Sequence, residues 1–185
     1  MLDIRQIHKH FNGDESSEDI NKQVGIKDLK MINYVTADIT DIEEIISMRL
    51  AYIRDDFGAQ SKKNEEAIKN QLKEYLNNHL GRDCFVFAAK EDGTIVATAF
   101  LVVFEKPANP SFLNGKVGNV LNVYTMPEKR RQGIAGNLMK MLIEHGKTCC
   151  LDFIELKATD DGYSLYKKLG FEDSPCGYKQ MKYAF

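Results

Sequence analysis

The chain has 185 residues, enough for a single domain to bury about 70% of the surface that its unfolded form exposes. Its 43% apolar and 28% charged residues are typical of globular proteins, and a net charge of −2 argues against a nucleic-acid partner. No apolar run approaches the roughly 20 residues of a membrane span, and the start has no signal-peptide core. We therefore expect a cytoplasmic protein with no membrane partner.

Four cysteines, Cys84, Cys149, Cys150 and Cys176, occur without CxxC pairing or secretory context, and they are interpreted as reduced thiols. A zinc site that uses Cys149, Cys150 and His145 is the alternative. Neighbours in sequence are poorly placed as joint ligands, so packing accounts better for these residues and no metal is expected.

Residues 1–30 are polar and are predicted to form an N-terminal extension to a domain at residues 31–185. Ile4, Ile7 and Phe11 fall at helical spacing, which is compatible with a short surface helix. Two explanations stay open for this segment. It packs on the domain or a partner, or it is sequence upstream of a natural start at Met31.

Hydrophobic periodicity and turn residues predict the elements that follow. Thr40 and Glu43 form a capping box that opens the first helix, and Gly58 ends that helix. In order, we expect a strand at 31–35, helices at 40–56 and 63–80, strands at 84–89 and 94–104, a loop at 106–116, a strand at 120–125, a helix at 134–146, a strand at 152–157, a helix at 161–169, a strand beginning at 171–172 and a last strand at 178–183.

The stretch from Val120 to Gly136 has the pattern of a phosphate site. A β-branched strand ends at Pro127, a basic run follows, and Gly133 opens a helix. The first N–H groups of a helix lack intrahelical partners, and the helix dipole adds partial positive charge there. Gly133 lets the backbone approach an anion closely, and Ala135 keeps the approach open.

The spacing distinguishes between families of phosphate loops. A Walker loop needs a Gly-Lys-Ser or Gly-Lys-Thr run, which this stretch lacks. A dinucleotide fingerprint needs three spaced glycines, and only Gly133 and Gly136 are present. The pattern Arg130-x-x-Gly133-x-Ala135 resembles the acetyl-CoA pyrophosphate loop of the GNAT N-acetyltransferase superfamily. A second block, Ala158–Phe171, resembles that superfamily's late helix and following strand. Asp160 or Asp161 is predicted to cap this helix, and Gly170 to end it.

The resemblance implies an α/β (α+β) fold, with a mixed central sheet of about six to seven strands flanked by about four helices. It also implies acetyl-CoA as the acetyl donor. The cofactor-binding residues implied in this way are Val123, Tyr124, Thr125, Arg130, Arg131, Gln132, Gly133, Ile134, Ala135, Gly136, Thr159, Tyr163 and Tyr166. Thr159 stands where many relatives carry Asn, so the sequence departs from the superfamily's pattern at one cofactor contact.

The reaction implied is direct attack of a neutral amine on the acetyl thioester. Backbone N–H groups of Val123, Tyr124 and Thr125 would stabilise the oxyanion. Tyr166 matches the tyrosine that often acts as general acid in this superfamily, because a phenol is a suitable proton donor to a thiolate. Tyr163, one turn earlier, is the alternative acid, and a core-packing role for Tyr166 is the non-catalytic alternative.

Three carboxylates are predicted to serve the acceptor. Glu105, at the end of the long strand, is the best candidate for the base, although a solvated strand-end acid explains it as well and ordered water can replace a base. Asp55, Asp56 and Glu105 hint at a cationic or amine-bearing acceptor.

The leading hypothesis is therefore an acetyl-CoA-dependent N-acetyltransferase that acts on a primary amine of a small molecule or peptide. The runner-up is a catalytically weak acyl-CoA-binding sensor or scaffold. A Rossmann-type nucleotide binder would need regular strand–helix alternation, which the region 40–125 lacks. A homodimer is compatible with the resemblance, and the acceptor is not identified.

Overall fold

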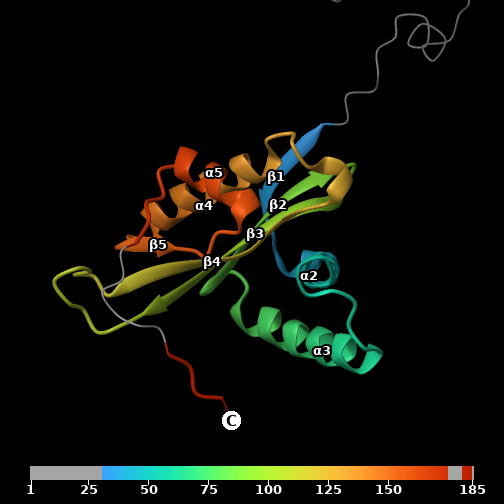
Figure 1. The fold of residues 1–185 in the computed structure, drawn as a ribbon, viewed down its shortest axis with the longest axis horizontal. Helices are drawn as coiled ribbons and strands as arrows, with labels where there is room; N and C mark the ends of the chain where they lie inside the picture. The colour runs from blue at the N-terminus through green and yellow to red at the C-terminus, as the bar shows by residue number, and fades with distance from the viewer. Residues whose placement is uncertain (1–30, 175–180, 185) are drawn as a thin grey trace, which may run out of the picture. The chain divides into compact units, whose positions relative to one another are not determined.

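The computed structural model describes residues 31–174 and 181–184, and within it Ile32–Phe185 form one compact unit. The extension predicted at residues 1–30, with its helix around Ile4, Ile7 and Phe11, lies outside the described residues. Among the described residues, helices in two layers enclose one β-sheet (Figure 1). This arrangement buries both faces of the sheet.

The sheet has five strands in the order β1-β2-β3-β4-β5. The first four pair antiparallel and the last pair is parallel. A parallel pair needs a crossover, which the helix α4 supplies. The strands are β1 (Ile32–Thr36), β2 (Cys84–Glu91), β3 (Thr94–Glu105), β4 (Lys116–Thr125) and β5 (Phe153–Glu155), and α4 spans Ile134–Thr148.

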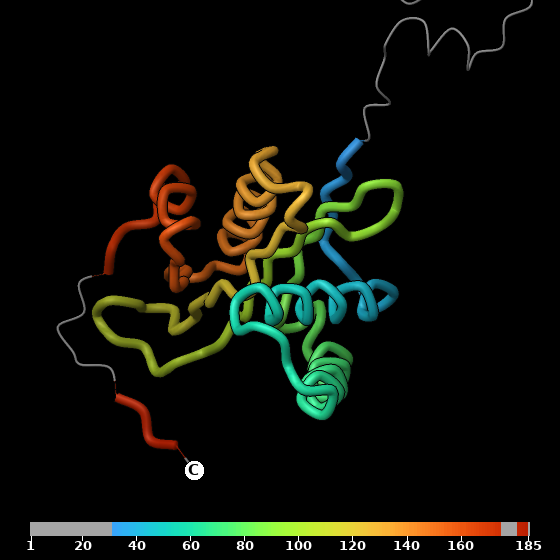
Figure 2. Tube along the Cα trace, turned by 45° about the vertical axis from the view of Figure 1, so that its right-hand side comes forward, coloured from blue at the N-terminus to red at the C-terminus, as the bar shows by residue number. Residues whose placement is uncertain are grey.

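Each face of the sheet carries its own helices and its own portion of the core. Helices α2 (Ile42–Phe57) and α3 (Lys62–His79) cover one face, where Ile45 and Leu76 are buried. Helices α4 and α5 (Asp160–Lys168) cover the other face, where Leu138 is buried (Figures 1 and 2). Strand alternation explains the division, since successive side chains of one strand point to opposite faces.

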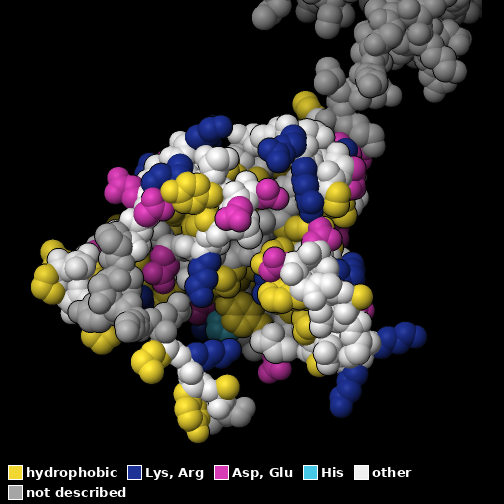
Figure 3. Space-filling model, in the orientation of Figure 1, with side chains coloured by type: hydrophobic (Ala, Val, Ile, Leu, Met, Phe, Trp, Pro, Cys, Tyr) yellow, Lys and Arg dark blue, Asp and Glu magenta, His cyan; other side chains and the backbone are white. Residues whose placement is uncertain are grey.

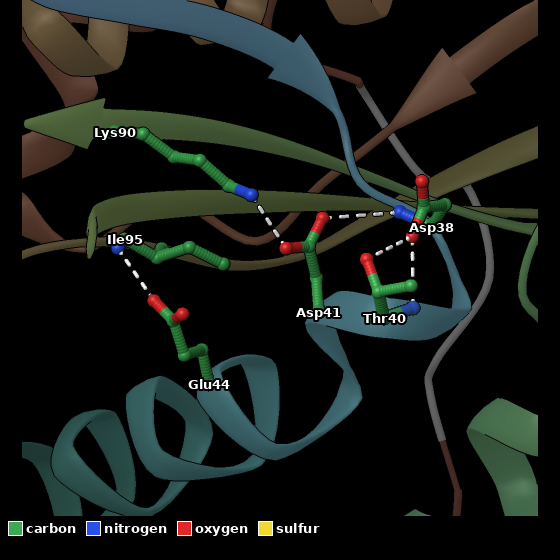
Figure 4. Close-up of polar contacts among 6 residues, drawn as sticks. All are labelled: Asp38, Thr40, Asp41, Glu44, Lys90 and Ile95. Atoms are coloured by element: carbon green, nitrogen blue, oxygen red, sulfur yellow. Dashed lines mark hydrogen bonds and ion pairs between the residues drawn. The ribbon is translucent and has the colours of Figure 1, made fainter. Parts of the chain in front are cut away.

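The start of α2 differs from the prediction. The predicted capping box of Thr40 and Glu43 is wrong. Asp38 instead accepts from the Thr40 amide at 2.8 Å, and Asp41 completes the box around a 3₁₀ turn, η2 (Ile39–Asp41) (Figure 4). The hydrogen bonds from the Thr40 hydroxyl and then from the Thr40 amide lower the pKa of Asp38. A short polar side chain two residues further upstream thus provides the cap.

Two charged contacts then fix α2 to the β2–β3 hairpin (Figure 4). Lys90 on β2 pairs with the nearly buried Asp41, and Glu44 accepts from the Ile95 amide at 2.7 Å. The pairing with Asp41 raises the pKa of Lys90. The first turn of α2 is therefore held on the sheet, and this fixes where the later turns of the helix lie.

The strand count is lower than predicted. The described residues contain five strands rather than six to seven. Phe171 and Glu172 are not in a strand, and the predicted last strand at 178–183 lies partly outside the described residues, with 181–183 also not in a strand. The remaining helices and strands predicted along residues 31–169 are present, with shifts of a few residues at their ends.

Of the two predictions about the ends of α5, the one for its start is wrong and the one for its end is confirmed. Thr159, not Asp160 or Asp161, caps the helix, because its hydroxyl accepts from the Gly162 amide at 3.2 Å. Gly170 has φ of 93°, which confirms the predicted left-handed residue after the helix.

Charges are interspersed over the face of the molecule that Figure 3 shows, with Lys and Arg side chains beside Asp and Glu. A polyanion-binding surface would concentrate one sign of charge. None of the described helices is long and apolar enough to cross a lipid bilayer.

Candidate active site

Strand β4 is paired on both sides only in its first half. Val117–Asn119 pair with all of β5, while Val120–Thr125 continue beside β3 with no β5 partner. The chain therefore leaves one edge of β4 open at the place where the strand runs into the phosphate-site pattern (Figure 1). An unpaired strand edge presents backbone N–H groups that a ligand can use.

A β-bulge lies in this open half. Thr98 pairs with Tyr124 and Phe100 with Leu121, so Asn122 and its successor face a single residue of β3. Asn122 has φ of 50°, a left-handed conformation that Asn tolerates better than most residues. Its buried amide donates to the Thr98 hydroxyl at 3.0 Å. Sequence analysis missed this bulge, for which a lone Asn among β-branched residues was the available signal.

The turn after β4 has the form that the sequence predicted. A 3₁₀ turn, η3 (Pro127–Lys129), leads to Arg131 with φ of 63° and to Gly133 with φ of 79°, which is the N-cap of α4. Among the described residues, the backbone N–H groups of residues 131–136 have no backbone acceptor. A Cβ placed on Gly133 would meet nothing within 4 Å. Open space in front of free amides fits a diphosphate.

The side chains of this turn have different roles. Ile134 is buried in the core, so only its backbone faces the turn. Gln132 donates to the Glu128 carbonyl at 3.3 Å, and Lys129 pairs with Glu91 at 2.6 Å. Arg131 is exposed and forms no ion pair within the described residues of the chain. Arg131 is thus the cation of the turn left available to a phosphate.

Arg130 is held away from that role. Its guanidinium pairs with Asp55 at 2.7 Å, donates to the Thr125 carbonyl at 3.0 Å, and lies 5.6 Å from the centroid of the Tyr124 ring. Asp55 also accepts from the Tyr124 hydroxyl at 3.0 Å. The hydrogen bonds from Arg130 and then Tyr124 lower the pKa of Asp55. Arg130 therefore joins the end of α2 to the end of β4.

The acids predicted to bind a cationic acceptor already have partners. Asp55 is shared by Arg130 and Tyr124, and Asp56 accepts from the Tyr52 hydroxyl at 3.1 Å. Tyr52 and Tyr124 form an edge-to-face pair with ring centroids 6.2 Å apart. The second half of α2 thus presents an aromatic surface to the open half of β4.

Arg49, on α2, also reaches this region. Its Nη1 donates to the side-chain oxygen of Asn122 at 3.1 Å, and its guanidinium carbon lies 5.2 Å from the centroid of the Tyr52 ring. The side chain is partly buried, and burial lowers the pKa of Arg49 from its ordinary value. Contact with the bulge at a sequence separation of 73 residues could not be anticipated from spacing.

Tyr166 projects from α5 into the same region from the other face of the sheet. It packs edge-to-face on Phe171 with centroids 5.9 Å apart, and a Cβ on Gly162 would come within 2.9 Å of its ring. Burial raises the pKa of Tyr166, and the nearby Tyr52 phenol adds to the effect. Tyr52, which packs on Tyr124 of the open half of β4, therefore acts electrostatically on Tyr166.

Two other predicted cofactor residues are engaged elsewhere. Tyr163 donates to the carboxylate oxygens of Asp173 at 3.0 and 3.1 Å, and Thr159 caps α5. Of the two tyrosines, Tyr166 is thus the one on which Tyr52 acts, while the Tyr163 hydroxyl is held by Asp173.

Glu105 lies far from these residues. It pairs with Lys116 in the register of β3 and β4, whereas Tyr124 pairs with Thr98. Seven strand positions separate Thr98 from Glu105, or about 23 Å at the usual rise per residue. Glu105 is exposed, with Lys116 as its ion-pair partner at 4.0 Å. The structure does not bring the predicted base to the predicted acid.

No group of three or more His, Cys, Asp or Glu side chains able to hold a metal occurs in the portion of the chain that the structure describes. The Cys149 sulfur lies 3.4 Å from His145 Nε2, while Cys150 is an exposed free thiol. These contacts place two of the three groups considered for zinc together without completing a site.

Comparison with known proteins identifies the family. The Acetyltransferase (GNAT) family model matches residues 45–171, and the chain belongs to that family. It is an acetyltransferase-family domain by both sequence and fold.

Solved structures agree. A predicted acetyltransferase from Clostridium acetobutylicum, crystallised with acetyl-CoA, is 30% identical with a TM-score of 0.72 over 82% of this chain and 96% of that chain. A GCN5-related N-acetyltransferase from Ralstonia eutropha is 26% identical with a TM-score of 0.69, over 82% of this chain and 99% of that one. No curated protein matches the chain significantly.

Proposed function

We propose that the protein is an acetyl-CoA-dependent N-acetyltransferase that moves the acetyl group to a primary amine of a small molecule or peptide by direct attack. The observation that carries the proposal is the open, bulged half of β4. It has free amides of the Gly133 turn at one end and Tyr166 beside it. A carrier that has both a diphosphate and a reacting thioester can use the free amides of the turn and the open strand edge together.

Binding of acetyl-CoA rests on the turn before α4. The amides of residues 131–136 would hold the diphosphate, and Arg131 would add a charge-assisted contact worth about 1.5–3 kcal/mol gross. Arg130 would act indirectly, because its pairing with Asp55 fixes the course of the chain between β4 and the turn.

The open edge of β4 would then receive the thioester. Met126 donates to the Val96 carbonyl on β3, and alternation along an antiparallel strand turns the Thr125 N–H, and beyond it that of Val123, to the β5 side. An N–H donor that is fixed in advance toward a developing oxyanion contributes roughly 3 kcal/mol to lowering the barrier.

The transfer itself balances without a covalent enzyme intermediate. The neutral amine nitrogen forms a bond to the acetyl carbon, the carbon–sulfur bond breaks, and the ammonium proton passes to water. Tyr166, whose raised pKa keeps it protonated at neutral pH, gives its phenolic proton to the departing thiolate and then regains a proton from water. The separation of Glu105 from Tyr124 weighs against a direct role for Glu105 as base.

Calorimetry with acetyl-CoA and steady-state thiol release with a panel of primary amines test the proposal. We expect acetyl-CoA to bind and thiol to appear only when an accepted amine is present. Binding of acetyl-CoA with no thiol release for any amine would favour the runner-up, an acyl-CoA-binding module. Absence of acetyl-CoA binding would reject the placement of the site.

A further inference from the structure

Arg49 carries the unbalanced charge of the candidate acceptor region. Among the described residues its guanidinium has a neutral hydrogen-bond acceptor, the side chain of Asn122, and a neutral aromatic neighbour, Tyr52. No carboxylate in the described residues forms an ion pair with it. A guanidinium has several N–H donors, so most of its hydrogen-bonding capacity is unused here.

The nearby acids are directed to other groups. Asp55 is shared by Arg130 and Tyr124, and Asp56 accepts from Tyr52 and acts on Arg49 only from beyond ion-pair distance. By contrast, Arg54 on the same helix has a carboxylate partner, Glu65, at 3.7 Å. Burying a cation partly without a counterion is costly, so such a residue marks a place where a ligand supplies the anion.

The position of Arg49 connects this charge to the reaction. It contacts Asn122, the residue at the centre of the β-bulge, two positions before Tyr124. It also lies against Tyr52, which acts electrostatically on Tyr166. A group held by Arg49 is therefore beside the open half of β4, on the α2 face of the sheet, where an amine can approach the thioester.

We propose that Arg49 binds an anionic group of the acceptor, so that the substrate is an amine that also carries a carboxylate or a phosphate. This inference rests on the proposed function and specifies its acceptor. It replaces the cationic acceptor suggested by Asp55, Asp56 and Glu105. Planar guanidinium groups bind both carboxylate and phosphate well, so the two anions are to be separated by experiment.

Matched pairs of amines test the charge requirement. Glycine, β-alanine, γ-aminobutyrate and L-phenylalanine are each compared with their carboxamides, and phosphoethanolamine with ethanolamine. We expect kcat/KM of at least one anionic member to exceed that of its neutral partner by about 10- to 100-fold, the size of one charge-assisted contact. The pair that responds identifies carboxylate or phosphate.

Two substitutions locate the effect at Arg49. In Arg49→Gln the preference for the anionic member over its neutral partner should fall toward one, while acetyl-CoA affinity stays within about 3-fold of wild type. Asn122→Asp keeps the arginine but gives it an internal carboxylate partner, and Asp tolerates the left-handed backbone. It should lower the preference in the same way. Arg54→Gln, the matched control, should retain it.

Binding provides a readout that needs no turnover. Each N-acetylated acid and its amide are titrated calorimetrically into the CoA-bound protein. Tighter binding of the acid, lost in Arg49→Gln, supports the inference even where the amine panel is silent. Equal binding of acid and amide, or an equal loss for both in Arg49→Gln, overturns it and assigns Arg49 to support of the bulge. A protein that fails to bind acetyl-CoA contradicts the proposed function instead.

Discussion

The two halves of β4 differ although they belong to one strand. Val117–Asn119 lie between β3 and β5, and Gly118 packs so closely that a Cβ would come within 2.7 Å of Leu101 and 2.9 Å of Leu151. Val120–Thr125 have β3 on one side only, contain the bulge and contact charged side chains of α2. The first half uses its backbone hydrogen bonds and its surface for contacts within the protein. The second half leaves a backbone edge and a surface that a ligand can contact.

The comparison separates stability from activity along one element. In the first half, hydrogen bonds and close packing leave no unpaired backbone group or open surface to which a ligand can bind. In the second half the unpaired edge and the partly unsatisfied Arg49 cost stability, and a bound ligand can compensate for them. Substitutions in the two halves should therefore have opposite consequences for folding and for turnover.

The largest expected effect is that of Tyr166→Phe. Removing the hydroxyl takes away the proton donor to the thiolate, so kcat should fall by about 100-fold or more, while acetyl-CoA affinity stays unchanged. Steady-state thiol release measures the loss. Tyr163→Phe, on the same helix with its hydroxyl on Asp173, is the control and should retain activity. A Tyr166→Phe enzyme within a few fold of wild type would falsify the role of general acid.

The pH profile of wild-type kcat sharpens the same prediction. Because burial raises the pKa of Tyr166 above its ordinary value near 10, the acid stays protonated across neutral pH. The rate should rise as the amine loses its proton, and a fall due to Tyr166 should come only above about pH 10. A descending limb near pH 8 that persists in Tyr166→Phe would belong to another group.

Gly133→Glu should have the next largest effect. A carboxylate at the head of α4 repels the diphosphate, and the expected loss of acetyl-CoA affinity is about 100-fold or more, since opposed like charges cost several kcal/mol. Calorimetry measures it. Gly81→Glu introduces the same side chain at a similar left-handed glycine, with φ of 77° and open space, in the turn after α3. Equal losses of acetyl-CoA affinity in Gly133→Glu and Gly81→Glu would assign the effect to backbone strain rather than to repulsion of the diphosphate.

Gly118→Ala should act on stability alone. The new methyl group meets Leu101 and Leu151 at distances that force them to shift, which costs about 1–3 kcal/mol of unfolding free energy. Urea denaturation measures the change. Gly136→Ala, where the methyl would find an ordinary contact at 3.5 Å within a helix, should be neutral or stabilising. An effect of Gly118→Ala on acetyl-CoA affinity as large as its effect on stability would contradict the division of β4.

The smallest effect concerns the pairing of Asp55 with Arg130. The pKa of Asp55 is lowered in the folded state, so its stabilising contribution is complete above the unfolded value near 4 and is lost as pH falls through the folded pKa. The thermal midpoint of Asp55→Asn should be below that of wild type at pH 7, and the two should converge as the pH falls below the unfolded value and through the lowered pKa of Asp55. Asp56→Asn is the neighbouring control. A constant difference at every pH would show that charge is not involved.

Elements whose conformation depends on nearby residues could be predicted from the order of the amino acids alone. Pro127 cannot continue a ladder, and Gly133 and Gly170 adopt left-handed conformations that other residues avoid, so the turn before α4 and the end of α5 followed from local stereochemistry. The helices and most strands followed from their hydrophobic periods. The motif around Gly133 was enough to indicate the family.

The roles of the charged residues, by contrast, depend on contacts between distant segments. Whether Asp55 binds an acceptor or Arg130, and whether Arg49 is solvated or contacts Asn122, depends on pairings between segments about 70 residues apart in the chain. The register of β3 on β4 separated Glu105 from Tyr124, and the early end of β5 opened the edge of β4. The type of a residue limits which contacts its side chain can make, but only the packing of distant segments determines which partner the side chain contacts.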